Sequence, residues 1–297
     1  NATWRDGWLN EGMTSYIESR LMEVIYDEAR VDEERVLSYH ELLLDFERVP
    51  ESMQALAPRL DDADPDGFQG TVHYHKGRMF LEHLEQSFGR EAFDPFLKSY
   101  FEEFAFGTIT TEQFLDYLDV QLLAGEGAPL TRAEVERWTY GAGLPDDVSL
   151  PSSANLEAAE TAARSWSAGD TELADIAVDD WSPQARFHLI NSLAADLSLD
   201  KIRVVDQGWQ LCASTNAEIG RNWFIQVASR RHVDAYGALE AYVNRHGRGR
   251  LIVPIYRALA ENGKDLERAQ AMFEQARAKY HPATVAWVER SLRVVAD

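Results

Sequence analysis

Apolar residues recur at the 3.6-residue period of an α-helix along most of this chain. The first such stretch begins at Trp8 and continues to residue 25, with polar residues between its apolar positions. Those apolar positions are Met13, Tyr16, Ile17, Leu21, Val24 and Ile25. We therefore predict an opening helix whose apolar face is partly buried.

Four further helical patterns follow the opening one, and turn-forming residues separate them. They cover residues 32–46, 74–88, 94–106 and 111–123. Asp94, followed by Pro95, is the expected N-cap of the third of these helices. Thr110 and Thr111, with Glu112 and Gln113 after them, predict the start of the fourth.

The second half of the chain consists of short helical patterns joined by short turns. They cover residues 155–168, 183–196, 199–212, 216–230, 233–246, 250–261, 264–279 and 283–295. Such a succession predicts an α-solenoid of stacked helix pairs, although no sequence repeat of fixed period is visible. We therefore predict an all-α protein with a first helical domain over 1–124, a linker over 125–153 and an α-solenoid over 154–297.

Composition and charge restrict the classes of partner. The chain has 297 residues, of which 45% are hydrophobic and 27% charged, as in ordinary globular proteins. No apolar run reaches the roughly 20 residues that span a bilayer. The net charge is −21, with 31 acidic and 12 basic residues in 1–150 against 19 and 17 in 151–297. This excess argues against nucleic acid or an anionic membrane as the main partner. It suits a cationic ligand such as a free amino terminus, or serves solubility alone.

Cysteine content and targeting signals add little. The single cysteine, Cys212, excludes an intrachain disulfide framework and a cysteine-rich zinc site. It is expected to be a small core residue. The cellular compartment stays open, because a chain that starts inside a longer protein could not show a leader sequence.

Two carboxylates on the opening helix are the first candidate chemical groups. Glu11 and Glu18 lie seven residues apart, which is about two helical turns, so they share one face beside the apolar stripe. A carboxylate buried there needs a metal, a cation or a hydrogen-bond donor. Spacing alone favours the simpler interpretation, a solvated flank of an amphipathic helix.

The segment 1–18, with Trp-Leu-Asn-Glu-Gly at 8–12, resembles the stretch that follows the zinc-binding helix in leukotriene A4 hydrolase-type aminopeptidases. The resemblance implies that Glu11 is the third protein ligand of a catalytic Zn²⁺. It also implies that Glu18 orients a zinc-bound histidine, a role known to strengthen metal sites. In that family an H-E-x-x-H helix shortly upstream supplies the other two ligands and the general base. We therefore expect this chain to be the C-terminal part of a metallopeptidase, divided inside its active site.

A second stretch, Thr-Val-His-Tyr-His-Lys-Gly at 71–77, resembles the family's V-P-Y-E-K-G segment. The resemblance implies that Tyr74 donates a hydrogen bond to the oxyanion formed during peptide hydrolysis. Without it, Tyr74 would be interpreted as a tyrosine that packs on the core at a helix start. Asp66 takes the place of an aspartate that lines the substrate pocket. Gln69 stands where leukotriene A4 hydrolases have a pocket tyrosine, a departure that favours a plain peptidase.

A third stretch is Arg-His-Gly-Arg-Gly-Arg at 245–250. Its guanidinium groups at Arg248 and Arg250 can converge on one carboxylate. The same spacing also fits a basic helix terminus that complements the helix dipole. The stretch resembles the family's Q-G-R-x-K, which implies that Arg248 and Arg250 receive the C-terminal carboxylate of a short peptide substrate.

Together these segments predict part of a zinc aminopeptidase whose substrates are short peptides. The N-terminal part of the same protein chain is the expected partner that completes its active site. The fragment alone is expected to be inactive and to bind zinc weakly or not at all, because one carboxylate cannot supply the three ligands of a catalytic site. Two alternatives remain open: a non-catalytic α-solenoid scaffold and a lipid epoxide hydrolase. An upstream H-E-x-x-H ending roughly 20 residues before Glu11 would decide between enzyme and scaffold.

Overall fold

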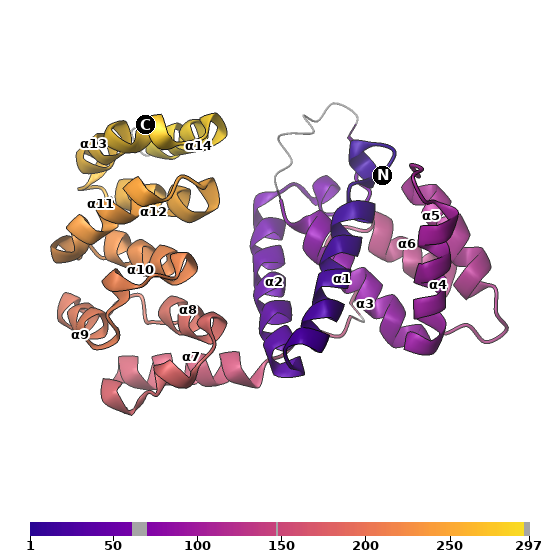
Figure 1. The fold of residues 1–297 in the computed structure, drawn as a ribbon, viewed down its shortest axis with the longest axis horizontal. Helices are drawn as coiled ribbons and strands as arrows, with labels where there is room; N and C mark the ends of the chain where they lie inside the picture. Colours follow the sequence, from indigo (N-terminus) through magenta and orange to yellow (C-terminus); the bar gives the residue numbers. More distant parts are fainter. Residues whose placement is uncertain (61–69, 147, 294–297) are drawn as a thin grey trace. The chain divides into compact units, whose positions relative to one another are not determined.

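The fold is built from helices alone in the parts of the chain that the structure describes. A computed structural model describes residues 1–60, 70–146 and 148–293, and no strand occurs in these ranges. The prediction of an all-α protein is therefore confirmed. The chain divides into two compact units, Asn1–Ser153 and Ala154–Asp297, which are described separately (Figure 1).

The described part of the first unit contains six α-helices. They are α1 (Trp8–Ile25), α2 (Glu28–Arg48), α3 (Val72–Phe88), α4 (Arg90–Glu103), α5 (Thr111–Leu118) and α6 (Arg132–Tyr140). The most extensive packing joins α1 to α3, and α2 and α4 flank this pair. At its centre the buried indole of Trp8 meets the rings of Phe80 and Phe114 edge-on, at centroid distances of 5.7 and 5.3 Å.

The apolar stripe predicted along α1 is buried only in its first half. Met13 and Tyr16 lie in the core, whereas the side chains of Ile17, Leu21 and Val24 are 36%, 56% and 83% exposed, and Ile25 is also exposed. The prediction that this face is partly buried is therefore confirmed, and the burial ends at Tyr16. Beyond Tyr16, the polar side chains Arg20 and Glu23 of α1 turn toward the neighbouring helices.

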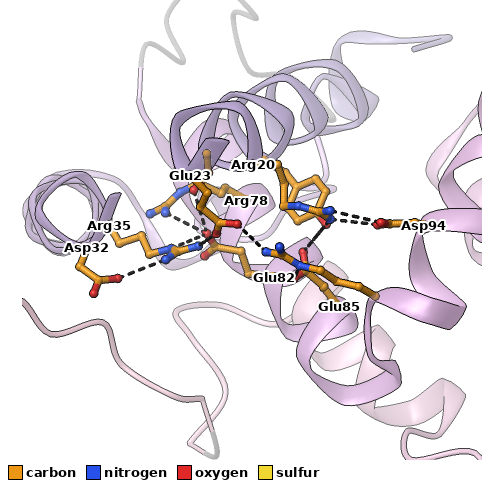
Figure 2. A network of polar contacts seen from close by, with 11 residues as sticks. Arg20, Glu23, Asp32, Arg35, Arg78, Glu82, Glu85 and Asp94 are labelled. Carbon is orange, nitrogen blue, oxygen red and sulfur yellow. Dashed lines mark hydrogen bonds and ion pairs between the residues drawn. The ribbon is translucent and has the colours of Figure 1, made fainter. Parts of the chain in front are cut away.

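These polar side chains belong to an ionic network that joins α1 to α4 (Figure 2). Arg20 pairs with Glu85 and Asp94 at 3.2 and 2.9 Å. Glu23 pairs with both Arg35 of α2 and Arg90 of α4, at 2.7 and 2.6 Å. Each of these ions has an opposite charge within contact distance, so the network replaces apolar packing at this end of α1.

The limits of α4 and α5 show which capping signals were decisive. Asp94 does not cap α4, because the helix begins directly after Gly89, whose φ of +76° suits a glycine. Asp94 instead pairs with Arg20. Thr110 caps α5 as predicted, in a capping box with Gln113.

Residues 125–153, predicted as a linker, contain α6. The side chains of Val135 and Trp138 on α6 are buried in the hydrophobic core of the first unit. The described residues 125–131, 141–146 and 148–153 lack helix, and α6 between them belongs to the first unit.

The second unit is a stack of short helices (Figure 1). They are α7 (Ala154–Ala168), α8 (Pro183–Asn191), α9 (Leu199–Trp209), α10 (Ala217–Ser229), α11 (Tyr236–Arg245), α12 (Gly249–Glu261), α13 (Leu266–Ala276) and α14 (Pro282–Arg293). Helices α8, α10, α12 and α14 pack successively against one another, and α11 packs against α13. This order of alternate helices is that of an α-solenoid.

Within the described ranges, every helix is too short or too polar to cross a membrane.

Candidate active site

The start of α1 holds Glu11 in a fixed place. The Nε1 of Trp8 donates a hydrogen bond to Oγ1 of Thr111 at 3.1 Å. The buried carboxylate of Asp6 accepts from the backbone N–H and the hydroxyl of Thr3, at 3.1 and 2.7 Å, and from the same two groups of Thr111, both at 2.8 Å. This satisfied buried carboxylate ties the entry of α1 to α5, so the first turn that carries Glu11 is rigid.

The start of α3 holds Tyr74. Asp45 of α2 accepts hydrogen bonds from the backbone N–H and the hydroxyl of Thr71, the residue before α3, at 2.5 and 2.7 Å. A carboxylate at this position also complements the helix dipole. Tyr74 lies in the first turn of α3, and its side chain is 42% exposed on the open side of the helix.

Glu11 and Tyr74 line one cavity of about 540 Å³ within the first unit. Trp4, Asn10 and His73 also line it. Burial raises the pKa of the Tyr74 phenol, and the nearby Glu11 carboxylate raises this pKa further through its charge and hydrogen bonding. Tyr74 is therefore a neutral hydrogen-bond donor at pH 7. The structure brings together a carboxylate and a phenol that lie 63 positions apart in the sequence.

Glu18 lies elsewhere. Its exposed side chain lines a second, smaller hollow of about 160 Å³ with Ser15, His75 and Arg78. The structure therefore does not place Glu18 in the cavity that Glu11 and Tyr74 share.

The histidines on either side of Tyr74 point into different surroundings. His73 lines the cavity of Glu11, and burial lowers the pKa of its imidazole to about 4. The Nε2 of His75 lies 3.2 Å from the carboxylate of Glu41. Among the described residues, no three histidine, cysteine or acidic side chains are grouped so that they could hold a metal ion.

Two predicted pocket residues, Asp66 and Gln69, lie outside the described residues. The other two predicted substrate-binding residues, Arg248 and Arg250, belong to the second unit. Arg248 is exposed and immediately precedes α12. Arg250, in the first turn of α12, forms an ion pair with Glu218 of α10.

The loop of Arg248 is held by its glycines. A Cβ at Gly249 would lie 2.5 Å from the ring of Trp287, and one at Gly247 would lie 3.3 Å from the backbone oxygen of Lys279. A side chain at Gly249 would require the Trp287 ring to shift, whereas one at Gly247 would require its neighbours to give by a few tenths of an ångström. Gly249 therefore permits the close approach between the start of α12 and Trp287.

Lys76 is a residue whose importance the sequence did not reveal. Its side chain is completely buried, and its Nζ donates to the backbone oxygens of Gln54 and Gly141 at 3.0 and 2.7 Å. Burial lowers the pKa of the Lys76 amine to about 7. Lys76 thereby joins α3, two residues after Tyr74, to the segment before α3 and to the end of α6. A lysine beside an apolar run gave no local signal that its amine is buried.

Comparisons with known proteins agree with these features. Residues 1–137 match the Peptidase family M1 domain, and residues 181–292 match the C-terminal domain of leukotriene A4 hydrolase. The resemblance predicted from the sequence is confirmed. This chain is similar to the M1 peptidases of leukotriene A4 hydrolase type.

Relatives and solved structures match almost the whole chain. Leucine aminopeptidase 2 of Lodderomyces elongisporus is 27% identical, over 99% of this chain and 52% of its own length. Leukotriene A-4 hydrolase of Xenopus laevis is 27% identical, over 100% of this chain and 50% of its own length. The structure of yeast leukotriene A4 hydrolase in complex with bestatin matches with a TM-score of 0.87 and 27% identity, over 97% of this chain and 50% of that one. The chain thus spans about half the length of the relatives that it matches.

Proposed function

We propose that this chain supplies one zinc ligand, the oxyanion donor and the substrate-carboxylate anchor of a zinc aminopeptidase that acts on short peptides. The observation that carries the proposal is that Glu11 and Tyr74 line one cavity at the starts of two packed helices. The family resemblance assigns a catalytic role to each of these residues. Because M1 peptidases are hydrolases of peptide bonds, the geometry is interpreted as half of a peptidase site.

The residues around Glu11 fit a zinc site in part. A carboxylate oxygen is an accepted zinc ligand, and Glu11 is only partly buried, so that an ion can reach it. A catalytic zinc normally has three protein ligands, and the described residues provide no group of three. Glu11 would therefore hold the ion with two histidines from an H-E-x-x-H segment encoded upstream. Bound there, zinc polarises the scissile carbonyl and activates water.

The other side chains stabilise the oxyanion and bind the substrate's carboxylate. Tyr74 donates its phenolic hydrogen to the oxygen that becomes negative when the carbonyl is attacked, and as a neutral donor it needs no prior proton transfer. Arg248 holds the peptide's C-terminal carboxylate, and Arg250 assists once it shares or releases Glu218. The acidic surface of the first half favours a substrate whose free amino group is positively charged.

The first test is made on the gene product that contains this chain. We expect it to bind about one zinc per molecule, to release N-terminal residues from tripeptides, and to be inhibited by bestatin, the ligand of the yeast structure. Glu11→Gln should reduce zinc retention through dialysis, and Glu28→Gln, on the exposed start of α2, serves as its matched control. Full peptidase activity of Glu11→Gln with unchanged zinc content would contradict the proposal.

The scaffold alternative makes the opposite prediction. A coding sequence without H-E-x-x-H before Glu11, together with a gene product that retains no zinc, would favour a non-catalytic helical protein. Hydrolysis of a lipid epoxide without peptide cleavage would favour the third alternative.

A further inference from the structure

Helices α1 and α3 touch through their backbones at one pair of glycines. A Cβ added to Gly77 would lie 2.8 Å from the Cα of Gly12, and one added to Gly12 would lie 2.9 Å from the Cα of Gly77. Contacts shorter than 3.0 Å are essentially never seen for real Cβ atoms, and the atoms that they would meet belong to backbone. No side chain can turn aside to make room, so each glycine permits the other's approach.

The crossing lies next to the candidate site. Gly12 directly follows Glu11, and Gly77 lies three residues, or about one helical turn, after Tyr74. The Cβ at Gly12 would also lie 3.3 Å from the backbone oxygen of His73, the residue before Tyr74. The backbone contact therefore extends from Gly12, which follows the proposed zinc ligand Glu11, to the first turn of α3.

Tyr74 depends on its helix for its position. Its side chain is 42% exposed, so the ring is only partly covered and its position follows that of the first turn of α3. The position of the Glu11 carboxylate likewise depends on the backbone of α1. The separation between the two helices thus determines the separation between the carboxylate and the phenol.

We propose that Gly12 and Gly77 are positioning residues, which bring α1 and α3 close enough for Glu11 and Tyr74 to act on one substrate carbonyl. This inference rests on the proposed peptidase function. An alanine at either position moves the helices apart by about 0.6 Å or more, since an ordinary contact needs at least 3.4 Å in place of 2.8 Å. Displacements of this order at a catalytic constellation lower rates by about tenfold to a hundredfold.

The chain offers a matched control glycine. Gly237 is helical and exposed on α11, and a Cβ there would meet nothing within 4 Å. Alanine is the better helix former, so Gly237→Ala should leave activity unchanged and keep or raise the melting temperature. Gly77→Ala and Gly12→Ala should lower the melting temperature instead, because the clash outweighs helix propensity.

The decisive measurement is kinetic and uses the gene product that contains this chain, with a tripeptide substrate. For Gly77→Ala and Gly12→Ala we expect kcat to fall at least about tenfold while KM changes less than about threefold, because the carboxylate anchor lies in the other unit. In a Tyr74→Phe background, Gly77→Ala should cost less than about threefold further, since the phenol that it displaces is already absent.

Three outcomes would overturn the inference. They are an unchanged kcat in both alanine variants, an equal loss of kcat with and without the Tyr74 hydroxyl, and failure of both variants to fold, which would assign the contact to the fold alone. The proposed function is tested separately in the same series. If Tyr74→Phe retains full kcat, the peptidase role of Tyr74 is wrong whatever the glycine variants do.

Discussion

Lys76 gives the sharpest stability prediction, because its amine is fully buried and, among the described residues, donates to two backbone carbonyls. Burial lowers the pKa of this amine from its ordinary 10.5 to about 7, and no neighbouring charge contributes to the shift. In the unfolded chain the amine holds its proton up to about pH 10.5, whereas in the folded chain it loses the proton near pH 7. Between these values the unfolded state binds more protons, so stability rises with pH.

The size of this rise follows from the two pKa values. One proton per molecule corresponds to about 1.4 kcal/mol per pH unit. Between pH 7 and pH 9, starting from half-protonation, the free energy of unfolding should increase by about 2 kcal/mol through Lys76 alone. Below about pH 7 this contribution is absent, because both states are then protonated.

The perturbation is Lys76→Met, which keeps an unbranched stem of four heavy atoms and removes the amine. Urea unfolding of the wild type and the variant, followed by the fluorescence of buried Trp8 and Trp138, gives both free energies across the pH range. The wild type should gain about 2 kcal/mol relative to Lys76→Met between pH 7 and pH 9. Other titrating groups are common to both proteins and cancel in the difference.

Lys98, an exposed lysine on α4, supplies the control. Lys98→Met should change the free energy of unfolding by less than about 0.5 kcal/mol, equally at each pH. Parallel pH profiles for the wild type and Lys76→Met would show that the buried amine keeps its ordinary pKa, and the reasoning from burial would be refuted.

Three further predictions concern the site and the core. Tyr74→Phe in the gene product should lower kcat by about a hundredfold to a thousandfold, as loss of one oxyanion donor does, and a change below about threefold would contradict its role. Arg248→Ala should raise KM for a tripeptide by at least about tenfold but leave KM for the C-terminal amide of that peptide unchanged. Glu218→Gln should lower KM for the tripeptide, because it frees Arg250. Met13→Ala should cost about 2–5 kcal/mol of unfolding free energy and Val24→Ala less than about 0.5, as measured by urea unfolding; equal costs would contradict the burial pattern of α1.

Local signals in the sequence were sufficient for much of the fold. Helical periodicity located most helices, since each exposes one face and buries the other. The residues from Thr110 to Gln113 predicted the start of α5, because the capping interactions of a helix close within one turn. The prediction that Asp94 caps a helix was wrong, because its carboxylate accepts a hydrogen bond from Arg20, which lies 74 positions away in the sequence.

The sequence by itself determined the helical class and, through the segments around Glu11, Tyr74 and Arg248, the resemblance to M1 peptidases. Only the tertiary structure decided which part of α1 is buried, since a helical stripe does not reveal where its packing partner ends. It also decided that Lys76 is enclosed, and that Glu11 and Tyr74 line one cavity. Such relations join positions far apart in the chain, and they arise from how closely two helix backbones approach, a distance that local sequence patterns do not encode.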